Sequence, residues 1–279
     1  MRLSIYTFVK DGLYFDFHVV DMLKHHLPLA DEIIVNEGFS TDGTYEAIKD
    51  LDPKIKVHRF EWDRSDPFTW HIKFKEQARR LCTGDWCLLL DCDEFIPDWQ
   101  FPMIRDFILN SNKDLMPLKY VHFYGNYKVV HTEPLKHHWP LYKMTLHRNR
   151  TDMEIWGDGS NVGIVGMKDR SMDPSTPFEC HHFGFVRNPA RLRQKWRMQT
   201  KMHAQKNPKW DKTPGVLFDL FPHRWDDEDF LNFMEVYEGP YVQAVRDNPD
   251  EFVRDDFSLL PLIAKRKERP VAAKNENRP

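Results

Sequence analysis

The sequence predicts an α/β fold in which a parallel sheet carries helices on both faces. The first hundred residues alternate short apolar runs with segments of helical periodicity, and such alternation is typical of parallel sheets. One apolar run, Cys87 to Leu90, leads directly into an acidic cluster, as expected of a buried strand that ends at a polar edge. After Pro97 the alternation stops, which predicts a mixed second half.

Apolar runs and 3.6-residue spacing define the elements of the first half. Trp70, Phe74 and Ala78, for example, lie four residues apart and mark one face of a helix. A turn rich in Gly, Ser and Asp precedes the second helix, which Asp42 or Thr44 can cap. We expect strands over 3–9, 32–35 and 55–60, a strand that ends at Asp91, and helices over 13–27, 45–51 and 70–81.

The second half has weaker signals. Asn188-Pro189 places a capping residue before a proline, which is a favoured start for a helix. We expect strands over 118–124, 141–147 and 178–186 and helices over 103–109, 188–206, 226–237 and 241–247.

The composition is that of an ordinary globular protein. The 279 residues carry a net charge of −3, and nothing in this balance indicates a nucleic-acid-binding protein. Nine Lys or Arg and a single acidic residue fall between Arg187 and Lys212. This basic stretch predicts either a solvated helix face or a surface that collects phosphates.

The cysteines and the N-terminal residues indicate the cellular compartment in which we expect the protein. The four cysteines form no Cys-x-x-Cys pair, so they imply neither a zinc ribbon nor a disulfide framework, and a reducing compartment fits them best. The N-terminus lacks the charged and apolar regions of a signal peptide. No apolar stretch approaches the roughly 18 residues of a transmembrane helix. We therefore expect a cytoplasmic protein, with peripheral association at a membrane as an alternative.

The acidic cluster after the apolar run is the most informative feature. Asp91, Asp93 and Glu94 follow a strand expected to be buried on both faces, where an unpaired carboxylate would be costly. They are tolerated if they meet a cation at the carboxyl edge of the sheet, where ligands of open α/β sheets bind. Two oxygen-bearing side chains one residue apart suit a hard divalent ion that also holds a pyrophosphate. The alternative is a solvated acidic turn.

Three further segments are expected at the same edge. Phe8 to Gly12 follows the first strand, Asn36 to Thr44 follows the second, and the helix over 73–83 leads into Gly84-Asp85-Trp86. In this order the segments resemble the family 2 type of GT-A glycosyltransferases. Members tend to read Val-Lys-Asn-Glu, then Asp-Asn-Gly-Ser-Thr-Asp-Gly-Thr, then Gly-Asp-Trp before a strand ending in Asp-Ala-Asp-Glu. The resemblance covers the first hundred residues and implies a GT-A fold with a Rossmann-like nucleotide-binding sheet and a nucleotide-sugar donor.

The resemblance also implies roles in donor binding. Asn36 and Glu37 would contact the base or ribose, and Lys75 would reach toward base or phosphate. Many relatives have Asp in place of Asn36, so the identity of the base stays open. The other residues assigned to the nucleotide-sugar site would offer backbone groups to the base, hold the turn or border the ribose, and they are Thr7, Val9, Lys10, Asp42, Asp91 and Cys92.

Metal ligands follow from the same resemblance. Asp91 would lie by the ribose and the metal, and Asp93 would bind the metal directly, which would be Mn²⁺ or Mg²⁺. His182 begins a His-Phe-Gly-Phe-Val-Arg segment that matches a His-x-Gly-x-Val-Arg-like pattern of relatives, and it is the expected third protein ligand. In an extended segment His181 points to the opposite face. The alternative for His182 is a structural histidine with satisfied hydrogen bonds.

The second half must supply the acceptor site. An inverting transferase needs a carboxylate that deprotonates the acceptor hydroxyl. Asp158, in a Gly-flanked loop beside a Trp, is the candidate, with Glu154 as the alternative. An ordinary Asp-Gly turn explains the same residues, and a retaining enzyme needs no such base. We expect inversion. We interpret 1–100 as the nucleotide-sugar-binding half of one GT-A domain, 101–225 as the acceptor-binding half, and 226–279 as C-terminal helices with a charged tail.

The predicted function is a metal-dependent transfer of a sugar from a UDP- or GDP-sugar to a hydroxyl acceptor, such as a glycan, a lipopolysaccharide or another polyanion. A nucleotidyltransferase would also place an acidic strand end on a metal. It would normally carry a Gly-rich phosphate loop, which Lys10-Asp11-Gly12 is not. A non-catalytic carbohydrate- or polyanion-binding module is the other alternative. Release of nucleoside diphosphate, release of pyrophosphate, or binding without turnover would distinguish the three.

Overall fold

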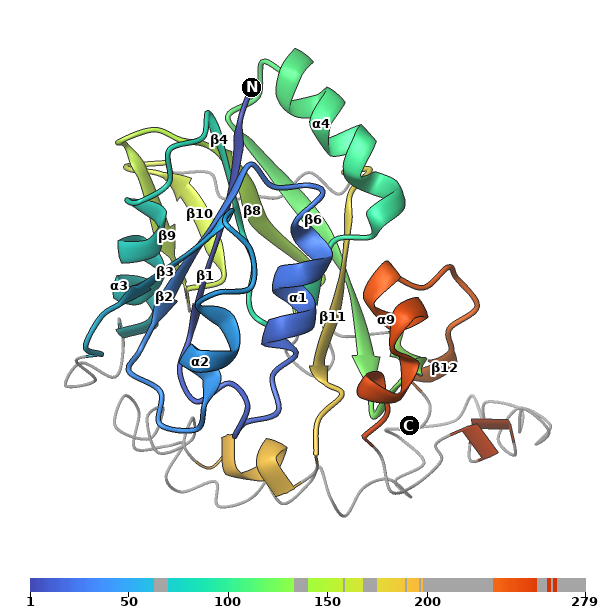
Figure 1. Cartoon of the computed structure of the whole chain (residues 1–279). Coiled ribbons are helices and arrows are strands. Elements are labelled where there is room, and N and C mark those ends of the chain that lie inside the picture. Colours follow the sequence, from blue (N-terminus) through green and yellow to red (C-terminus); the bar gives the residue numbers. More distant parts are fainter. Residues whose placement is uncertain are drawn as a thin grey trace, which may run out of the picture.

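A ten-stranded mixed sheet forms the centre of the protein, with helices packed around it (Figure 1). No helix among the described residues has the length and apolar character needed to cross a membrane. The computed structural model describes residues 1–62, 70–132, 140–157, 159–167, 175–188, 190–195, 197, 233–254, 260–261 and 263–264.

The parallel half of the sheet comes from the first ninety residues, as the sequence predicts. The neighbouring strands β1 and β2 pair in parallel, so that Val9 lies opposite Glu37 at their carboxyl ends. The carboxyl ends of the other two parallel strands reach the same edge. In spatial order the four strands are β4 (Trp86–Leu89), β1 (Leu3–Val9), β2 (Glu32–Glu37) and β3 (Ile55–Arg59).

Helices cover both faces of this parallel half, which confirms the predicted layering. Leu3 and Ile5 of β1 share a core with Val19 of α1, whereas Tyr6, which points to the other face, shares a core with Ala78 of α3. Alternate residues of one strand therefore face different helices, as the pleat of a strand requires. The helices of this half are α1 (Val19–His26), α2 (Thr44–Ile48) and α3 (Trp70–Arg79).

The second half extends the same sheet with mainly antiparallel strands. Strand β8 (Tyr142–Arg148) joins β4 on one side and β6 (Leu115–Tyr124) on the other, antiparallel to both. Strand β11 (Glu179–Phe185) runs parallel to β6 and antiparallel to the short strand β5 (Glu94–Phe95). This double pairing brings β11 beside the acidic cluster that follows β4.

The remaining elements lie at the periphery of the sheet (Figure 1). A two-stranded hairpin, β9–β10, packs beside α3. Strand β12 pairs with β7 at the end of the sheet opposite β3. These elements are η1 (Asp98–Gln100), α4 (Phe101–Asn110), β7 (Asn126–His131), β9 (Met153–Trp156), β10 (Asn161–Ile164), β12 (Met234–Val236), α9 (Gln243–Asp247) and η3 (Pro249–Phe252).

The first helix is shorter than predicted, because its expected N-terminal turns form a separate loop. Asp11 and Asp16 adopt positive φ angles of 50° and 55°, which a right-handed helix does not accommodate. The Asp42 carboxylate accepts a hydrogen bond from the backbone N–H of Tyr14 at 2.6 Å, which ties the loop to the next turn. Residues 13–16 therefore lie at the carboxyl edge of the sheet, and the helix begins only at Val19.

Two expectations for the C-terminal region need correction. Residues 234–236 form a strand rather than the end of a helix, because Met234 and Val236 pair with His131 and Val129 of β7. The helix predicted over 241–247 begins only at Gln243. Residues 190–195 are helical, as predicted, whereas 198–232, which carry the rest of two predicted helices, lie outside the described residues.

Candidate active site

Three carboxylates gather where β4 ends, and each is paired with a cation from a distant part of the chain. Such pairing is what makes buried carboxylates tolerable. The side chains of Asp93 and Glu94 are almost fully buried, whereas 28% of the Asp91 side chain is exposed. The pairs are Asp91 with Lys75 of α3 at 2.6 Å, Glu94 with Lys143 of β8 at 2.5 Å, and Asp93 with Arg187, which follows β11.

The electrostatics of this cluster favour the charged forms of Asp93 and Lys143, whereas burial raises the pKa of Glu94. Burial alone would raise the pKa of Asp93, but the positive charge of Arg187 holds it well below its ordinary value. Burial alone would lower the pKa of Lys143, but the neighbouring carboxylates of Glu94 and Asp91 raise it. At neutral pH the cluster therefore contains fixed charges of both signs at the carboxyl edge.

His182 is brought to this cluster by the register of β11. It lies opposite Glu94 in the antiparallel pairing with β5, and its Nε2 is 3.7 Å from an oxygen of Asp93. Ligand atoms of these three residues lie within 4.8 Å of one another. Burial lowers the pKa of His182 despite the opposing effect of Asp93. The ring is therefore neutral, as a metal-ligating histidine must be.

Gly184 keeps the space between these ligand atoms open. A Cβ at this position would collide with Nε2 of His182 and lie 3.2 Å from Oδ2 of Asp93. Carboxylate oxygens and a neutral imidazole are ligands for Mn²⁺. The residues present therefore fit a divalent ion between Asp93, Glu94 and His182.

The predicted ligand set differs from this trio by one residue. Asp93 and His182 lie together, as expected, but Glu94 takes the place of Asp91 in the cluster. Asp91 turns instead toward Lys75 and lies 3.9 Å from Lys143. His181 faces away from the cluster, against Phe123 and Tyr237, as the alternation of an extended strand requires.

The predicted base-contacting residues of β2 are engaged inside the protein. Asn36 is fully buried and donates hydrogen bonds to the carbonyl of Phe74 and to the side chain of Gln77, both at 2.9 Å. Glu37 is also fully buried and accepts from the backbone N–H groups of residues 39 and 40 and from Arg59. Glu37 thus braces the turn after β2, and Asn36 ties β2 to the middle of α3.

The other predicted nucleotide-site residues link β1 to its neighbours. Cys92 donates to the carbonyl of Phe8 at 3.3 Å and lies 3.6 Å from the hydroxyl of Thr7, which ties the acidic segment to β1. The backbone carbonyl of Val9 accepts from Gly38 at 2.9 Å. Lys10 donates to the carbonyl of residue 39 at 2.9 Å, while Asp42 accepts from the backbone and hydroxyl of residue 44.

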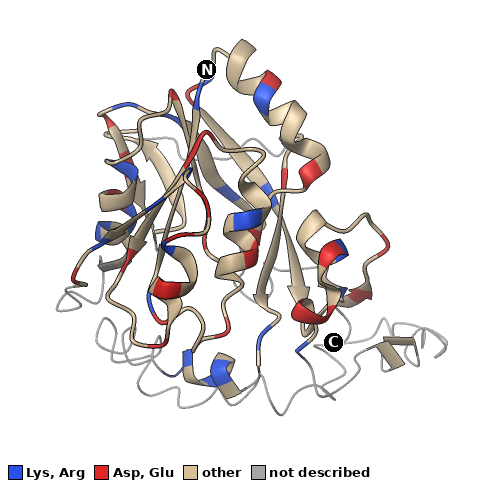
Figure 2. Ribbon diagram, viewed as in Figure 1, with Lys and Arg blue, Asp and Glu red and all other residues tan. Residues whose placement is uncertain are grey.

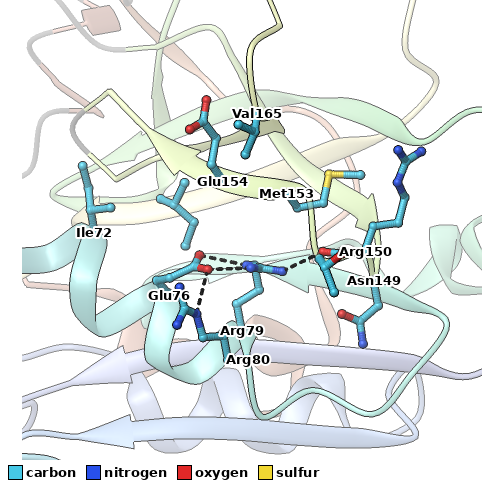
Figure 3. A pocket seen from close by; sticks show the side chains of 11 residues that line it. Ile72, Glu76, Arg79, Arg80, Asn149, Arg150, Met153, Glu154 and Val165 are labelled. Carbon is cyan, nitrogen blue, oxygen red and sulfur yellow. Dashed lines mark hydrogen bonds and ion pairs between the residues drawn. The ribbon is translucent and has the colours of Figure 1, made fainter.

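A hollow lies between α3 and the β9–β10 hairpin (Figure 3). Its volume is about 790 Å³ and its walls include Glu154. Its charged groups are largely paired with one another, since Glu76 accepts from both Arg79 and Arg80. None of its lining residues belongs to the acidic cluster. Asp158, the predicted base, lies outside the described residues.

Basic residues after β11 cover the loop that follows β1 (Figure 2). Arg191 lies over the ring of Tyr14 at 4.0 Å, and the Lys195 ammonium is 5.0 Å from the centre of the Phe17 ring. Burial and the nearby Arg187 lower the pKa of Lys195 to about 8. The described part of the basic stretch therefore borders the acidic cluster rather than forming only a solvated helix face.

Four charged residues of this site have no individual role predicted from the sequence, although Glu94 is part of the predicted acidic cluster. Glu94 is the last residue of the acidic motif, and Arg187 is the last residue of the motif that begins at His182. Their positions could have indicated a role in the site. The sequence around Lys143 and Lys195 does not indicate that they belong to the site. Lys143 lies on β8 and Lys195 in the basic stretch, and only the fold brings them to the acidic cluster.

The chain matches the model of glycosyl transferase family 2 over residues 18–190, which is more than half of its length. The chain belongs to glycosyl transferase family 2. The protein is accordingly a glycosyltransferase, with the α/β fold of the GT-A type that the sequence predicts. This membership favours the enzyme over the nucleotidyltransferase and the binding module. Comparison with curated proteins gives no match.

Solved structures similar to this glycosyltransferase differ strongly from it in sequence. Staphylococcus aureus TarS 1–349 in complex with UDP is 13% identical, with a TM-score of 0.45, over 82% of this chain and 73% of that chain. Glucosyl-3-phosphoglycerate synthase from Mycobacterium tuberculosis with Mn²⁺ and UDP-glucose is 16% identical, with a TM-score of 0.31, over 44% of each chain. Mannosyltransferase PcManGT from Pyrobaculum calidifontis with GDP-Man and Mn²⁺ is 17% identical, with a TM-score of 0.33, over 44% of this chain and 36% of that chain.

Proposed function

We propose that this glycosyltransferase moves a sugar from a UDP- or GDP-sugar to a hydroxyl acceptor, with Mn²⁺ or Mg²⁺ held by Asp93, Glu94 and His182. The observation that carries the proposal is the cluster of these ligands at the carboxyl edge of the parallel sheet, within 4.8 Å of one another, with Gly184 leaving room between them. Ligands of open α/β sheets bind at that edge.

The leaving group is a nucleoside diphosphate, and its developing negative charge must be stabilised. A bound divalent ion would supply Lewis-acid stabilisation of the diphosphate. The chain adds fixed positive charge of its own, because Lys75, Lys143 and Lys195 all lie close to the carboxylates. Lys75 and Asp91 together form the border between the donor's ribose and its phosphates in this proposal.

The donor-binding wall consists of residues that support the nucleotide site through hydrogen bonds within the protein and do not contact the nucleotide directly. Asn36 and Glu37 fix the turn after β2 through their internal hydrogen bonds, while Cys92 and Thr7 join the acidic segment to β1. Lys10 and Asp42, together with the backbone of Val9, hold the two loops that frame the site, so these seven of the nine assigned residues support one wall.

Acceptor activation is proposed to follow the inverting course. Asp158 is the proposed base because it lies between Gly157 and Gly159, and a Cβ at Gly159 would lie 3.1 Å from the side chain of His71 at the start of α3. A role as base requires this turn to border the donor site, and the proximity of Gly159 to the start of α3 supports that requirement. The basic residues around Arg191 favour a polyanionic acceptor, since they lie beside the loop after β1.

The test measures nucleotide release from UDP- and GDP-sugars with and without Mn²⁺. Release of nucleoside diphosphate that requires Mn²⁺ supports the proposal. Asp93→Asn should then lower kcat by more than about a hundredfold, because metal-linked charge stabilisation is worth several kcal/mol and about 1.4 kcal/mol corresponds to a factor of ten. The matched control is Asp106→Asn, a change at an exposed position on α4, which should leave kcat unchanged. Release that is equally fast without Mn²⁺ would exclude the metal role.

A further inference from the structure

We propose that His122 is a positioning residue that fixes the tautomer of His182 and so leaves the Nε2 of His182 free to bind the metal ion. The inference rests on the proposed function, because it concerns the same metal site. His122 lies on β6 and is 1% exposed. It contacts His182, and its effect on the proposed metal site would be transmitted through that one ring.

Sheet register places the two histidines side by side. His182 lies directly opposite His122 in the parallel pairing of β11 with β6. Their Nδ1 atoms are 2.8 Å apart, and the two rings are nearly perpendicular, at 85°. The contact joins residues 60 positions apart in sequence, and it belongs to the sheet rather than to a loop.

The direction of the hydrogen bonds can be derived from one backbone carbonyl. The Nε2 of His122 lies 2.7 Å from the carbonyl oxygen of Pro140. A carbonyl oxygen can only accept a hydrogen bond, so Nε2 of His122 carries the proton. A neutral imidazole has one N–H and one lone pair, and the lone pair of His122 must then be on Nδ1.

The tautomer of His122 in turn determines the tautomer of His182. Because Nδ1 of His122 accepts, Nδ1 of His182 must donate across the 2.8 Å contact. The lone pair of His182 is then on Nε2, and this is the atom that lies 3.7 Å from Asp93 and within the ligand cluster. Hydrogen bonds of this kind orient metal-binding histidines and set which nitrogen is available.

The experiment measures Mn²⁺ affinity by titration of the metal-free protein, followed by electron paramagnetic resonance of free Mn²⁺. His122→Phe keeps an aromatic ring but removes both hydrogen bonds. Loss of the hydrogen bonds to Pro140 and His182 should weaken Mn²⁺ binding by about 10- to 100-fold, the usual effect of losing such a partner. His122→Gln should restore most of the affinity, because its amide can donate to Pro140 and accept from His182.

A matched control comes from the neighbouring strand β8. His147 is also a buried, hydrogen-bonded histidine, with Tyr6 and the carbonyl of Arg148 as partners, but it is not part of the ligand cluster. His147→Phe should leave Mn²⁺ affinity unchanged. An equal loss of affinity in both phenylalanine variants would mean that His122 acts only through packing, and this would overturn the inference.

A second measurement does not depend on how the variants fold. Nitrogen-15 spectra of the histidine rings in the metal-free wild-type protein should show the proton of His182 on Nδ1, and a proton on Nε2 would overturn the inference. Failure of the proposed function looks different. If the wild-type protein binds no Mn²⁺, the metal role itself is excluded. If it binds Mn²⁺ and His122→Phe binds equally well, only the role of His122 is excluded.

Discussion

Arg187 donates a hydrogen bond to the carboxylate of Asp93 across 94 positions of sequence, and both side chains are almost completely buried. The arginine also stacks over the ring of Phe17, with its guanidinium carbon 3.7 Å from the ring centre. The proposed metal ligand is therefore held by the protein's own cation. A metal ion and Arg187 would both neutralise the same carboxylate, which leads to the first prediction.

Arg187→Met should destabilise the metal-free protein and make its stability depend on Mn²⁺. Removing one partner of a buried ion pair costs about 3–5 kcal/mol, because the other charge is left uncompensated. Mn²⁺ should restore part of this loss by taking over the charge of Asp93. Thermal unfolding with and without Mn²⁺ measures both effects. In the control, Arg150→Met, the exposed pair with Asp114 is lost, and little change is expected. A Mn²⁺-induced shift no larger in Arg187→Met than in the wild type would contradict the prediction.

Gly184→Ala should abolish Mn²⁺ binding, and its effect on the stability of the fold should be smaller. The added methyl group would collide with Nε2 of His182 and crowd Asp93, so it would occupy the space proposed for the ion. Calorimetric titration with Mn²⁺ measures the affinity, and thermal unfolding of the metal-free variant measures the cost to the fold. Retained Mn²⁺ affinity with a lowered melting temperature would show that the gap at Gly184 serves packing instead.

His147→Phe should make the free energy of unfolding depend less steeply on pH between 6.5 and 4. Burial first, and then the nearby Arg79, lower the pKa of His147 from 6.5 to about 4. The unfolded chain therefore binds a proton that the folded chain does not bind between these values. The stabilising contribution of neutral His147 is fully present above pH 6.5 and is lost as the pH falls toward 4. The slope is about 1.4 kcal/mol per pH unit for this proton. Urea unfolding at several pH values measures it, and an unchanged slope in the variant would refute the assignment.

A polyanionic acceptor would make turnover sensitive to salt. If the basic residues after β11 bind such an acceptor, kcat/KM for the acceptor should fall as salt rises, because screening weakens exposed charges. Arg193→Glu should weaken both the activity and its salt dependence. Arg80→Glu, directly after α3 and beside the hollow lined by Glu154, is the control and should leave the salt dependence intact. Turnover that is independent of salt would indicate a neutral acceptor.

The parallel half of the fold was predictable because its signals are local. Strand β1 has the predicted bounds, from Leu3 to Val9, and β2 and β3 differ from prediction by one or two residues at one end. Apolar runs, helical spacing and turn residues suffice there. The N-terminal boundary of α1 was not predictable, because the break at Asp11 and Asp16 is stabilised by contacts from a later turn.

The strands of the second half were harder to predict because long-range pairing stabilises them. Strand β7 and the β9–β10 hairpin are not among the strands that the sequence predicts, and β12 falls within a predicted helix. Each becomes a strand through a partner elsewhere in the chain. The same holds for the site. The motifs identified Asp93 and His182, but only the sheet pairing brings Glu94, rather than Asp91, to the histidine.

The position of β11 between β5 and β6 also has a consequence for folding. The ligand cluster joins two segments far apart in sequence, and closing such long loops is slow compared with forming local structure. During synthesis the acidic segment leaves the ribosome long before His182 and Arg187 are made. The carboxylate of Asp93, whose cationic partner is Arg187, must then stay hydrated until β11 docks. Docking of that one strand delivers the histidine and the arginine together, and metal binding can therefore report on the last stage of folding.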